Sequence, residues 1–308
     1  MYMTLRSMIK TAGFLAATFC FSLSYASHFT LPPSREALIG QVQYASAESG
    51  DTTPSIAERY NLGVNAIVAA NPGIRENMLI QAGAPIKISG QFLLPPLPRR
   101  GIVINLSEMR LYYYPEGSNE VMTFPIGIGR IGKTIPIRPT KVVRKTINPT
   151  WTPPQDIREF DEQLGIKVPR VVLAGPDNPL GPYAIYLGIP TYLIHSTIFP
   201  ESIGNRSSFG CIRMHENDIK QFYSLMKPGI PVMIVDMPNK VAWEDTTLYL
   251  EAHPPLEERS HLSTLQNLVN TVQSKLPRNH VTLVNWQMVS YLSEEPDGVP
   301  HEIGVVVK

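Results

Sequence analysis

The part of the chain best suited to chemistry is a short stretch that carries a cysteine after a glycine, with a histidine upstream. Cys211 follows Gly210, and the absence of a side chain there lets the backbone approach another molecule closely. His195 ends an apolar run, Tyr192 to Ile194, that is typical of a strand and would hold an imidazole rigidly. A thiol needs a base or an electropositive setting to attack near neutral pH, and histidine is the usual base. The pair therefore predicts acyl transfer by a cysteine nucleophile.

The neighbours of Cys211 are candidates for the other roles. Ser208 could orient His195 through a hydrogen bond, as the third member of a triad does, or it could be an ordinary turn serine. The backbone amides of Gly210 and Cys211 could form an oxyanion hole. Arg213 could lower the pKa of the thiol or clamp a substrate carboxylate. A helix predicted just after the cysteine would direct its positive dipole end toward the thiol.

Two other patterns near the cysteine are weaker. His215 and Cys211 could share a helix face and chelate a metal with Asp218, but structural zinc needs four ligands and no second Cys or His pair exists. The glycine-rich run 127–134 fits neither nucleotide fingerprint and is predicted to be a β turn or loop. We therefore predict no metal and no organic cofactor. The remaining histidines lie outside the probable catalytic region and are expected to be solvated: His28, His253, His261, His280 and His301.

Length and composition exclude some classes of protein. The 308 residues suffice for about two domains with their own cores. Charged residues make up 17% and the formal net charge is +1, so the chain has no strong field of the kind that nucleic-acid-binding proteins carry. We predict no nucleic acid partner.

The N-terminus has the pattern of a secretory signal peptide. Arg6 and Lys10 precede an apolar run, 11–23, that is short for a membrane span, and small residues then end at Ala26. We predict cleavage after Ala26, with an uncleaved membrane anchor as the alternative. Removal of residues 1–26 deletes Cys20 and leaves Cys211 as the only cysteine. A lone free thiol in an exported protein needs a chemical explanation, or it is a buried inert side chain.

Residues 39–89 are predicted to form a compact unit after a short polar leader at 28–38. Ile39 to Ala45 alternates like a strand, Thr53 is the expected N-cap of a helix that ends at Tyr60, a second helix covers 64–70, and a strand closes at 85–88. This β-α-α-β order resembles a LysM peptidoglycan-binding module, with matching residues at 50–52, 55–57, 71 and 83. The alternative is a small packing domain that binds nothing. Residues 90–99 read as an extended linker.

The rest of the chain divides at about residue 236. Residues 100–236 are predicted to be β-rich, with a hairpin at 101–106 and 109–114, strands at 121–126, 141–145, 183–187 and 232–235, and short helices at 156–164 and 216–226. Residues 237–308 are predicted to be an α+β extension of unknown role, with a strand at 248–252 and an amphipathic helix at 262–275.

The segments 194–197 (IHST) and 208–214 (SFGCIRM) together resemble the active-site signature of the L,D-transpeptidases, which have a YkuD-type catalytic domain. The likeness extends across roughly 100–236 and implies a mainly β fold with short helices. With the LysM-like module in front, it resembles the periplasmic Gram-negative members. One position departs from the family pattern, because Phe209 stands where a histidine often precedes the Gly-Cys pair. Phe209 is instead expected to shape an apolar substrate wall.

The resemblance implies a two-step acyl transfer on peptidoglycan stem peptides in the periplasm. It also implies that the enzyme is a target of carbapenems. Cys211 would attack the diaminopimelate carbonyl of a tetrapeptide stem, with His195 as the base. D-alanine would depart as the leaving group, and a thioester on Cys211 would remain. The acceptor would be a second stem or a lysine of a wall-tethered protein such as an outer-membrane lipoprotein. Candidate substrate contacts are Tyr183, Arg213 and Ser196. The alternatives are an L,D-carboxypeptidase that uses water and a non-enzymatic LysM-type wall-binding protein.

Overall fold

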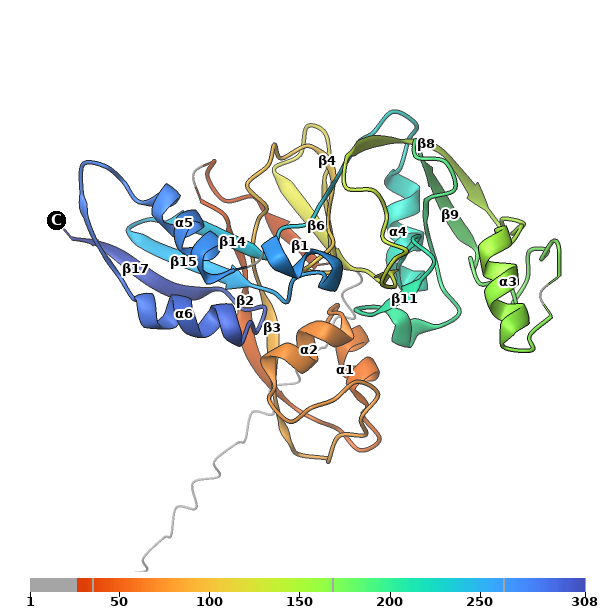
Figure 1. Ribbon diagram of the computed structural model, residues 1–308, viewed down its shortest axis with the longest axis horizontal. Helices are drawn as coiled ribbons and strands as arrows, with labels where there is room; N and C mark the ends of the chain where they lie inside the picture. The colour runs from red at the N-terminus through yellow and green to blue at the C-terminus, as the bar shows by residue number, and fades with distance from the viewer. Residues whose placement is uncertain (1–26, 35, 168, 263, 308) are drawn as a thin grey trace, which may run out of the picture.

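The computed structural model describes residues 27–34, 36–167, 169–262 and 264–307 (Figure 1). The predicted signal peptide, 1–26, lies outside the described residues. The largest sheet has nine strands in the order β1-β6-β5-β4-β13-β8-β9-β10-β12. Their bounds are β1 Ser27–Thr30, β4 Gly101–Asn105, β5 Arg110–Tyr114, β6 Glu120–Pro125, β8 Pro139–Ile147, β9 Tyr183–Leu187, β10 Leu193–His195, β12 Ile212–Arg213 and β13 Pro231–Val235.

The central strands of this sheet are buried on both faces. In the predicted hairpin of β4 and β5, Ile104 pairs with Leu111 and Val103 with Tyr112. Side chains alternate between faces along a strand. Ile104 and Leu111 therefore join one core cluster, whereas Val103 and Tyr112 join another. The sheet thus separates two cores, and both must be covered by other elements.

The N-terminal module covers one of these faces. It consists of β2 Leu38–Ser46, α1 Thr53–Arg59, α2 Val64–Ala70 and β3 Pro85–Leu93, so the predicted β-α-α-β order is confirmed. Helix α1 begins one residue earlier than predicted, because Thr52 is the N-cap and exchanges hydrogen bonds with Ser55. Strand β3 pairs with β2 along its whole length and extends to Leu93, which includes the first residues of the predicted linker. The module packs its buried side chains directly on the large sheet.

The segment predicted to be a polar leader contains a strand. Ser27 to Thr30 form β1, which pairs antiparallel with β6 at the edge of the large sheet. Phe29 packs edge-on against Phe92 of β3, with ring centroids 6.5 Å apart. The polar composition of 28–38 hid this strand, because its stability comes from tertiary pairing rather than from its own residues.

The other face carries the elements that frame the cysteine. Helix α4, Glu216–Leu225, packs against β9 and buries Ile219 and Phe222 in the core. A short parallel pair joins β7, Ile128–Gly129, to β11, Arg206–Ser208, and the 3-10 helix η1 covers Pro200–Ser202. The glycine-rich run was predicted to be a turn or loop, and its first part instead forms the short strand β7. Between β8 and β9 the chain makes a long excursion that contains α3, Gln155–Gln163 (the α3 excursion).

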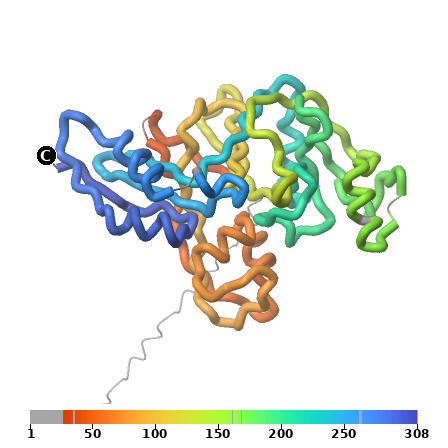
Figure 2. Tube along the Cα trace, in the orientation of Figure 1, coloured from red at the N-terminus to blue at the C-terminus, as the bar shows by residue number. Residues whose placement is uncertain are grey.

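The C-terminal extension is a separate α+β layer, as predicted. Its sheet has the order β14-β15-β17-β16, with β14 Asn239–Glu244, β15 Thr247–Ala252, β16 Val281–Val284 and β17 His301–Val307. Helices α5, Leu265–Lys275, and α6, Trp286–Glu294, pack on this sheet around Leu248, Leu268 and Val289. The 3-10 helix η2 covers Glu257–Leu262. Figure 2 shows the extension and the α3 excursion at opposite ends of the molecule.

The predicted helix 262–275 begins only at Leu265, because the side chain of Thr264 caps it and Leu262 belongs to η2. No helix within the described ranges has both the length and the hydropathy needed to cross a bilayer.

Candidate active site

Cys211 lies in the short connection between β11 and β12 and is the free cysteine of the described chain. The helix predicted at 216–226 begins at Glu216, as expected, but residues 212–213 form β12, pair with β10 and separate the helix from Cys211. The influence of a helix dipole falls off within the first turn. The expectation that a helix N-terminus activates the thiol is therefore wrong. Cys211 and His215 also do not share a helix, so the chelating arrangement considered from the sequence does not form.

The backbone conformation and the close packing at position 210 require a glycine. Its φ of 112° lies in a region that L side chains rarely adopt. A Cβ added there would also lie 2.7 Å from Cε1 of Tyr192 and 2.9 Å from the carbonyl oxygen of Lys133. The backbone before the cysteine thus passes between the β9–β10 turn and the loop that follows β7.

Ser208 does not serve the role of orienter that the sequence suggested. Its Oγ donates to the carbonyl oxygen of Cys211 at 2.6 Å and accepts from the N–H of Gly210 at 3.0 Å. The Nδ1 of His195 has no hydrogen-bond partner among the described residues. Ser208 therefore shapes the cysteine loop instead. The Gly210 amide, one of the two predicted oxyanion donors, already donates to this serine.

His195 is placed beside this loop by the register of two strands. Strand β10 pairs parallel with β12, Ile194 opposite Ile212 and His195 opposite Arg213, and the Met214 amide donates to the His195 carbonyl oxygen at 2.9 Å. The side chain of His195 is buried. Burial, with the positive charge of Arg213, lowers its pKa to about 3. The imidazole is consequently neutral at physiological pH, the form that can accept a proton.

The thiol is also in its neutral form at rest. Burial raises the pKa of Cys211, although the Leu193 backbone and the charge of Arg213 act in the opposite direction. Its Sγ lies 3.7 Å from the carbonyl oxygen of Thr191, within the range of a weak S–H donor. Thr191 has a φ of 71°, an unusual value for a β-branched residue. Sequence reasoning missed Thr191, because only the backbone of this turn contacts the thiol.

Arg213 brings a positive charge to the site. Its Nη1 donates to Ser207 Oγ at 3.0 Å, while its buried Nε has no hydrogen-bond partner among the described residues. Its backbone is fixed by an exchange of two hydrogen bonds with Gly127, each 2.9 Å long. The same guanidinium lowers the pKa of both His195 and Cys211.

The side chains of the two other predicted substrate contacts, Ser196 and Tyr183, pack against other parts of the protein. Ser196 is fully buried, and its Oγ donates to the Leu180 carbonyl oxygen at 3.0 Å and accepts from the Tyr183 amide at 3.3 Å. The ring of Tyr183 packs against Tyr223, with centroids 5.2 Å apart. The hydroxyl of Ser196 therefore holds the end of the α3 excursion next to His195 and is not free to bind a substrate.

Phe209 has a partner that sequence reasoning did not anticipate. The guanidinium carbon of Arg130 lies 3.6 Å from the centroid of Phe209 and 4.0 Å from that of Phe160 in α3. The two rings meet edge to face at 5.5 Å. Lys133 adds an ion pair to Asp156 of the same helix. The phenylalanine before the Gly-Cys pair thus fastens α3 to the cysteine loop through a cation–π contact.

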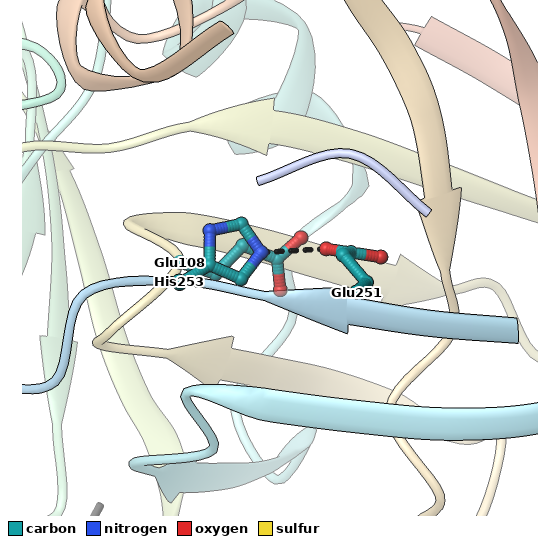
Figure 3. A group of neighbouring side chains, drawn as sticks. All are labelled: Glu108, Glu251 and His253. Atoms are coloured by element: carbon teal, nitrogen blue, oxygen red, sulfur yellow. Dashed lines mark hydrogen bonds and ion pairs between the residues drawn. The ribbon is translucent and has the colours of Figure 1, made fainter. Parts of the chain in front are cut away.

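One cluster among the described residues has the ligand types of a metal site, Glu108, Glu251 and His253 (Figure 3). Figure 3 shows the imidazole of His253 directed at Glu251, to which it bonds at 2.6 Å. A protein cation already occupies this place: Lys240 Nζ lies 2.9 Å from Glu108 and 2.8 Å from Glu251. Burial alone would raise the pKa of Glu108, but the charge of Lys240 lowers it overall. The expectation that His253 is solvated is wrong.

Two regions of the chain match known protein families. Residues 99–234 match the model of the L,D-transpeptidase catalytic domain (YkuD), and residues 48–89 match the LysM domain. The chain is 43% identical over 240 residues to the probable L,D-transpeptidase YcfS of Escherichia coli K12, which covers 76% of this chain and 75% of the relative.

Two further relatives complete the comparison. The chain is 41% identical to the probable L,D-transpeptidase YbiS of the same strain, with 83% of this chain and 84% of the relative covered. The solved catalytic domain of the Enterococcus faecium L,D-transpeptidase aligns with a TM-score of 0.35 at 20% identity, over 46% of this chain and 100% of that domain.

Proposed function

This chain belongs to the L,D-transpeptidase family with a YkuD-type catalytic domain, and on that premise we propose that it transfers diaminopimelate acyl groups of peptidoglycan stems through a thioester on Cys211. The observation that carries the proposal is the parallel register of β10 and β12, which places His195 opposite Arg213, two residues after Cys211. Residues 100–236 would carry the reaction, and residues 39–89 would bind the wall.

In the first step, Cys211 attacks the carbonyl of the diaminopimelate at position 3 of a tetrapeptide stem. The thiol proton passes to the imidazole of His195 as the S–C bond forms. The Cys211 amide stabilises the oxyanion of the tetrahedral intermediate. The C–N bond to D-alanine then breaks, the imidazolium returns its proton to the leaving amine, and the thioester remains.

In the second step an amine attacks the thioester carbonyl. It yields its proton to His195, the C–S bond breaks, and the departing thiolate recovers the proton. The acceptor would be the side-chain amine of a second diaminopimelate or a lysine of a wall-tethered protein such as an outer-membrane lipoprotein. Water in its place would make the reaction a carboxypeptidase hydrolysis.

The resting charges define how this cycle begins. Because the pKa of His195 is lowered and that of Cys211 is raised, both groups begin neutral. The thiolate then develops only as the proton moves, and Arg213 stabilises the negative charge as it appears. The positive charge of Arg213 is also proposed to attract a carboxylate of the stem.

The proposal includes export. A cleavable signal peptide at residues 1–26 would deliver the protein to the periplasm, where the stem peptides lie. Ser27, the residue after the predicted cleavage point, is paired with Thr123 in the large sheet.

The test uses the protein from Ser27 onward with diaminopimelate tetrapeptide muropeptides, read by mass spectrometry. We expect dimers that lack one D-alanine, and none with Cys211→Ser. If D-alanine is released without dimers, candidate lipoproteins are added as acceptors. If D-alanine is still released and no lipoprotein–stem adduct forms, water is the acceptor. Absence of any turnover, together with absence of a covalent carbapenem adduct on Cys211, would leave only wall binding by residues 39–89.

A further inference from the structure

We propose that the C-terminal extension holds the cysteine loop in its working geometry, with Glu258 as a positioning residue. The inference rests on the proposed role of Cys211. Glu258 belongs to η2, the segment that follows β15 and returns from the extension to the catalytic domain. Its carboxylate contacts two separate segments that frame Cys211.

The return segment is fixed on both sides of Glu258. Leu256 is 2% exposed and belongs to the core cluster of the catalytic domain, together with Ile128 and Ile135. Arg259 Nε donates to Asp236 Oδ2 at 2.6 Å, and Asp236 also accepts from Ser107. The chain at Glu258 therefore has a defined place on the catalytic domain.

Glu258 binds an arginine and a threonine at once. Its Oε1 accepts from Arg206 Nη2 at 2.8 Å and from the hydroxyl of Thr134, while its Oε2 accepts from Arg206 Nη1 at 2.9 Å. Arg206 Nη2 also donates to Thr134 Oγ1 at 3.1 Å, and Nη1 contacts Glu257. The hydrogen bond from Arg206 is the main reason that the pKa of Glu258 falls to about 2. The bidentate pair fixes orientation as well as distance.

The first held segment leads directly to the nucleophile. Arg206 is the first residue of β11, and its Nε donates to the Gly129 carbonyl oxygen at 3.1 Å. The last residue of β11 is Ser208, which bonds both the Cys211 carbonyl oxygen and the Gly210 amide. A movement of Arg206 would therefore be passed along a three-residue strand to the backbone of Cys211.

The second held segment forms the opposite wall. Thr134 follows Lys133, whose carbonyl oxygen would lie 2.9 Å from a Cβ at Gly210. The side chains of Lys133 and Arg130 face Phe209, at 5.8 Å and 3.6 Å from its ring centroid. One carboxylate thus fixes both the strand that enters the cysteine loop and the loop that packs against it.

The C-terminal extension that carries Glu258 is anchored to the rest of the protein by buried ion pairs. Lys240 of β14 lies between Glu108 and Glu251, and all three side chains are buried. Glu251 also accepts from the Leu93 amide at 2.5 Å, which joins the extension to β3. Exposed ion pairs contribute little to stability, but they can fix geometry. The latch of Glu258, Arg206 and Thr134 should therefore affect catalysis more than folding.

The test compares Glu258→Ala with Glu258→Gln and with the matched control Glu294→Ala, an exposed glutamate of α6. We expect Glu258→Ala to lower kcat on the order of 10- to 100-fold at nearly unchanged KM and Tm, since misplacement of about 1 Å has effects of that size. Glu258→Gln, which keeps the acceptor oxygen, should lose less. Glu294→Ala should match the unmodified protein.

Hydrogen–deuterium exchange supplies a readout that does not need turnover. Residues 205–211 and 130–135 should exchange faster in Glu258→Ala and not in Glu294→Ala. Faster exchange in a protein that shows no turnover would support the latch while the proposed function fails. The latch would be overturned if exchange and kcat in Glu258→Ala were both unchanged. It would also be overturned if kcat fell together with Tm and exchange rose over the whole domain.

Discussion

The hydroxyl of Ser208 donates to the carbonyl oxygen of Cys211 at 2.6 Å, so the serine three residues before the nucleophile shapes its backbone and does not bind the base. The Oγ of Ser208 also accepts from the Gly210 amide at 3.0 Å. One small side chain therefore closes the loop on which the thiol is presented, and the imidazole is positioned separately by the pairing of β10 with β12.

Replacement of Ser208 by alanine should damage geometry without altering proton transfer. The Gly210 amide would lose its partner in a buried loop, which costs about 1–3 kcal/mol of folding free energy. We expect kcat to fall on the order of tenfold or more. The pH at which half-maximal rate is reached should stay the same, because Ser208 does not contact His195. A shift of that pH in Ser208→Ala would restore the triad interpretation. Ser118→Ala, at an exposed serine in the turn between β5 and β6, is the control.

The reactivity of Cys211 should rise at a higher pH than that of a free cysteine. Burial raises its pKa, so the thiolate population at neutral pH is small. Alkylation by iodoacetamide, followed by mass spectrometry, should therefore have its midpoint above that of the same protein unfolded in urea. Arg213→Gln should move the midpoint further upward, because the charge that opposes the shift is lost. A midpoint near or below neutrality would indicate a resting thiolate–imidazolium pair.

The sequence predicted local elements more reliably than long-range contacts. The bounds of β9 and α2 followed from local patterns, since strand alternation and helix capping act over a few residues. Strand β1 was missed because it forms only against β6. The latch was missed because Arg206 and Glu258 are 52 residues apart, and no local pattern reports a pair at that separation. The partner of Ser208 was misassigned because a hydroxyl can turn toward any nearby acceptor.

Acid should destabilise the fold before its carboxylates are protonated. The pKa values of His195 and His215 fall from 6.5 to about 3 and about 4, chiefly through burial. Below pH 6.5 the unfolded chain binds protons that the folded chain does not, so the free energy of unfolding decreases as pH falls through this window. Between pH 7 and pH 4.5 each residue should contribute a loss of ~2 kcal/mol.

Urea unfolding at the two pH values measures this loss. His215→Gln should remove about half of the loss due to these two histidines, because Gln does not titrate. Replacement of the exposed His280 by Gln should leave the difference unchanged. A protein whose stability is the same at pH 7 and pH 4.5 would contradict the neutral, buried state of both imidazoles.

The contact between Arg130 and Phe209 should hold α3 near the cysteine loop. Arg130→Ala removes the cation from between Phe209 and Phe160, a contact of about 0.5–1 kcal/mol where it is partly exposed. We expect faster proteolysis within the α3 excursion and little change in Tm. Arg158→Ala, in α3 but without an aromatic partner among the described contacts, is the matched control. Equal proteolysis of both variants and the unmodified protein would show that Phe209 does not restrain the helix.

Lys240 should be the most sensitive position outside the catalytic domain. Lys240→Met would leave Glu108 and Glu251 buried without their shared cation, and such a change destabilises by about 3–5 kcal/mol. Urea unfolding should show this loss, whereas Lys227→Met, at an exposed lysine, should show none. Addition of Glu251→Gln to Lys240→Met should recover part of the stability, because one buried negative charge disappears with the cation. If Lys240→Met unfolds at the same urea concentration as the unmodified protein, the extension is not anchored through this cluster.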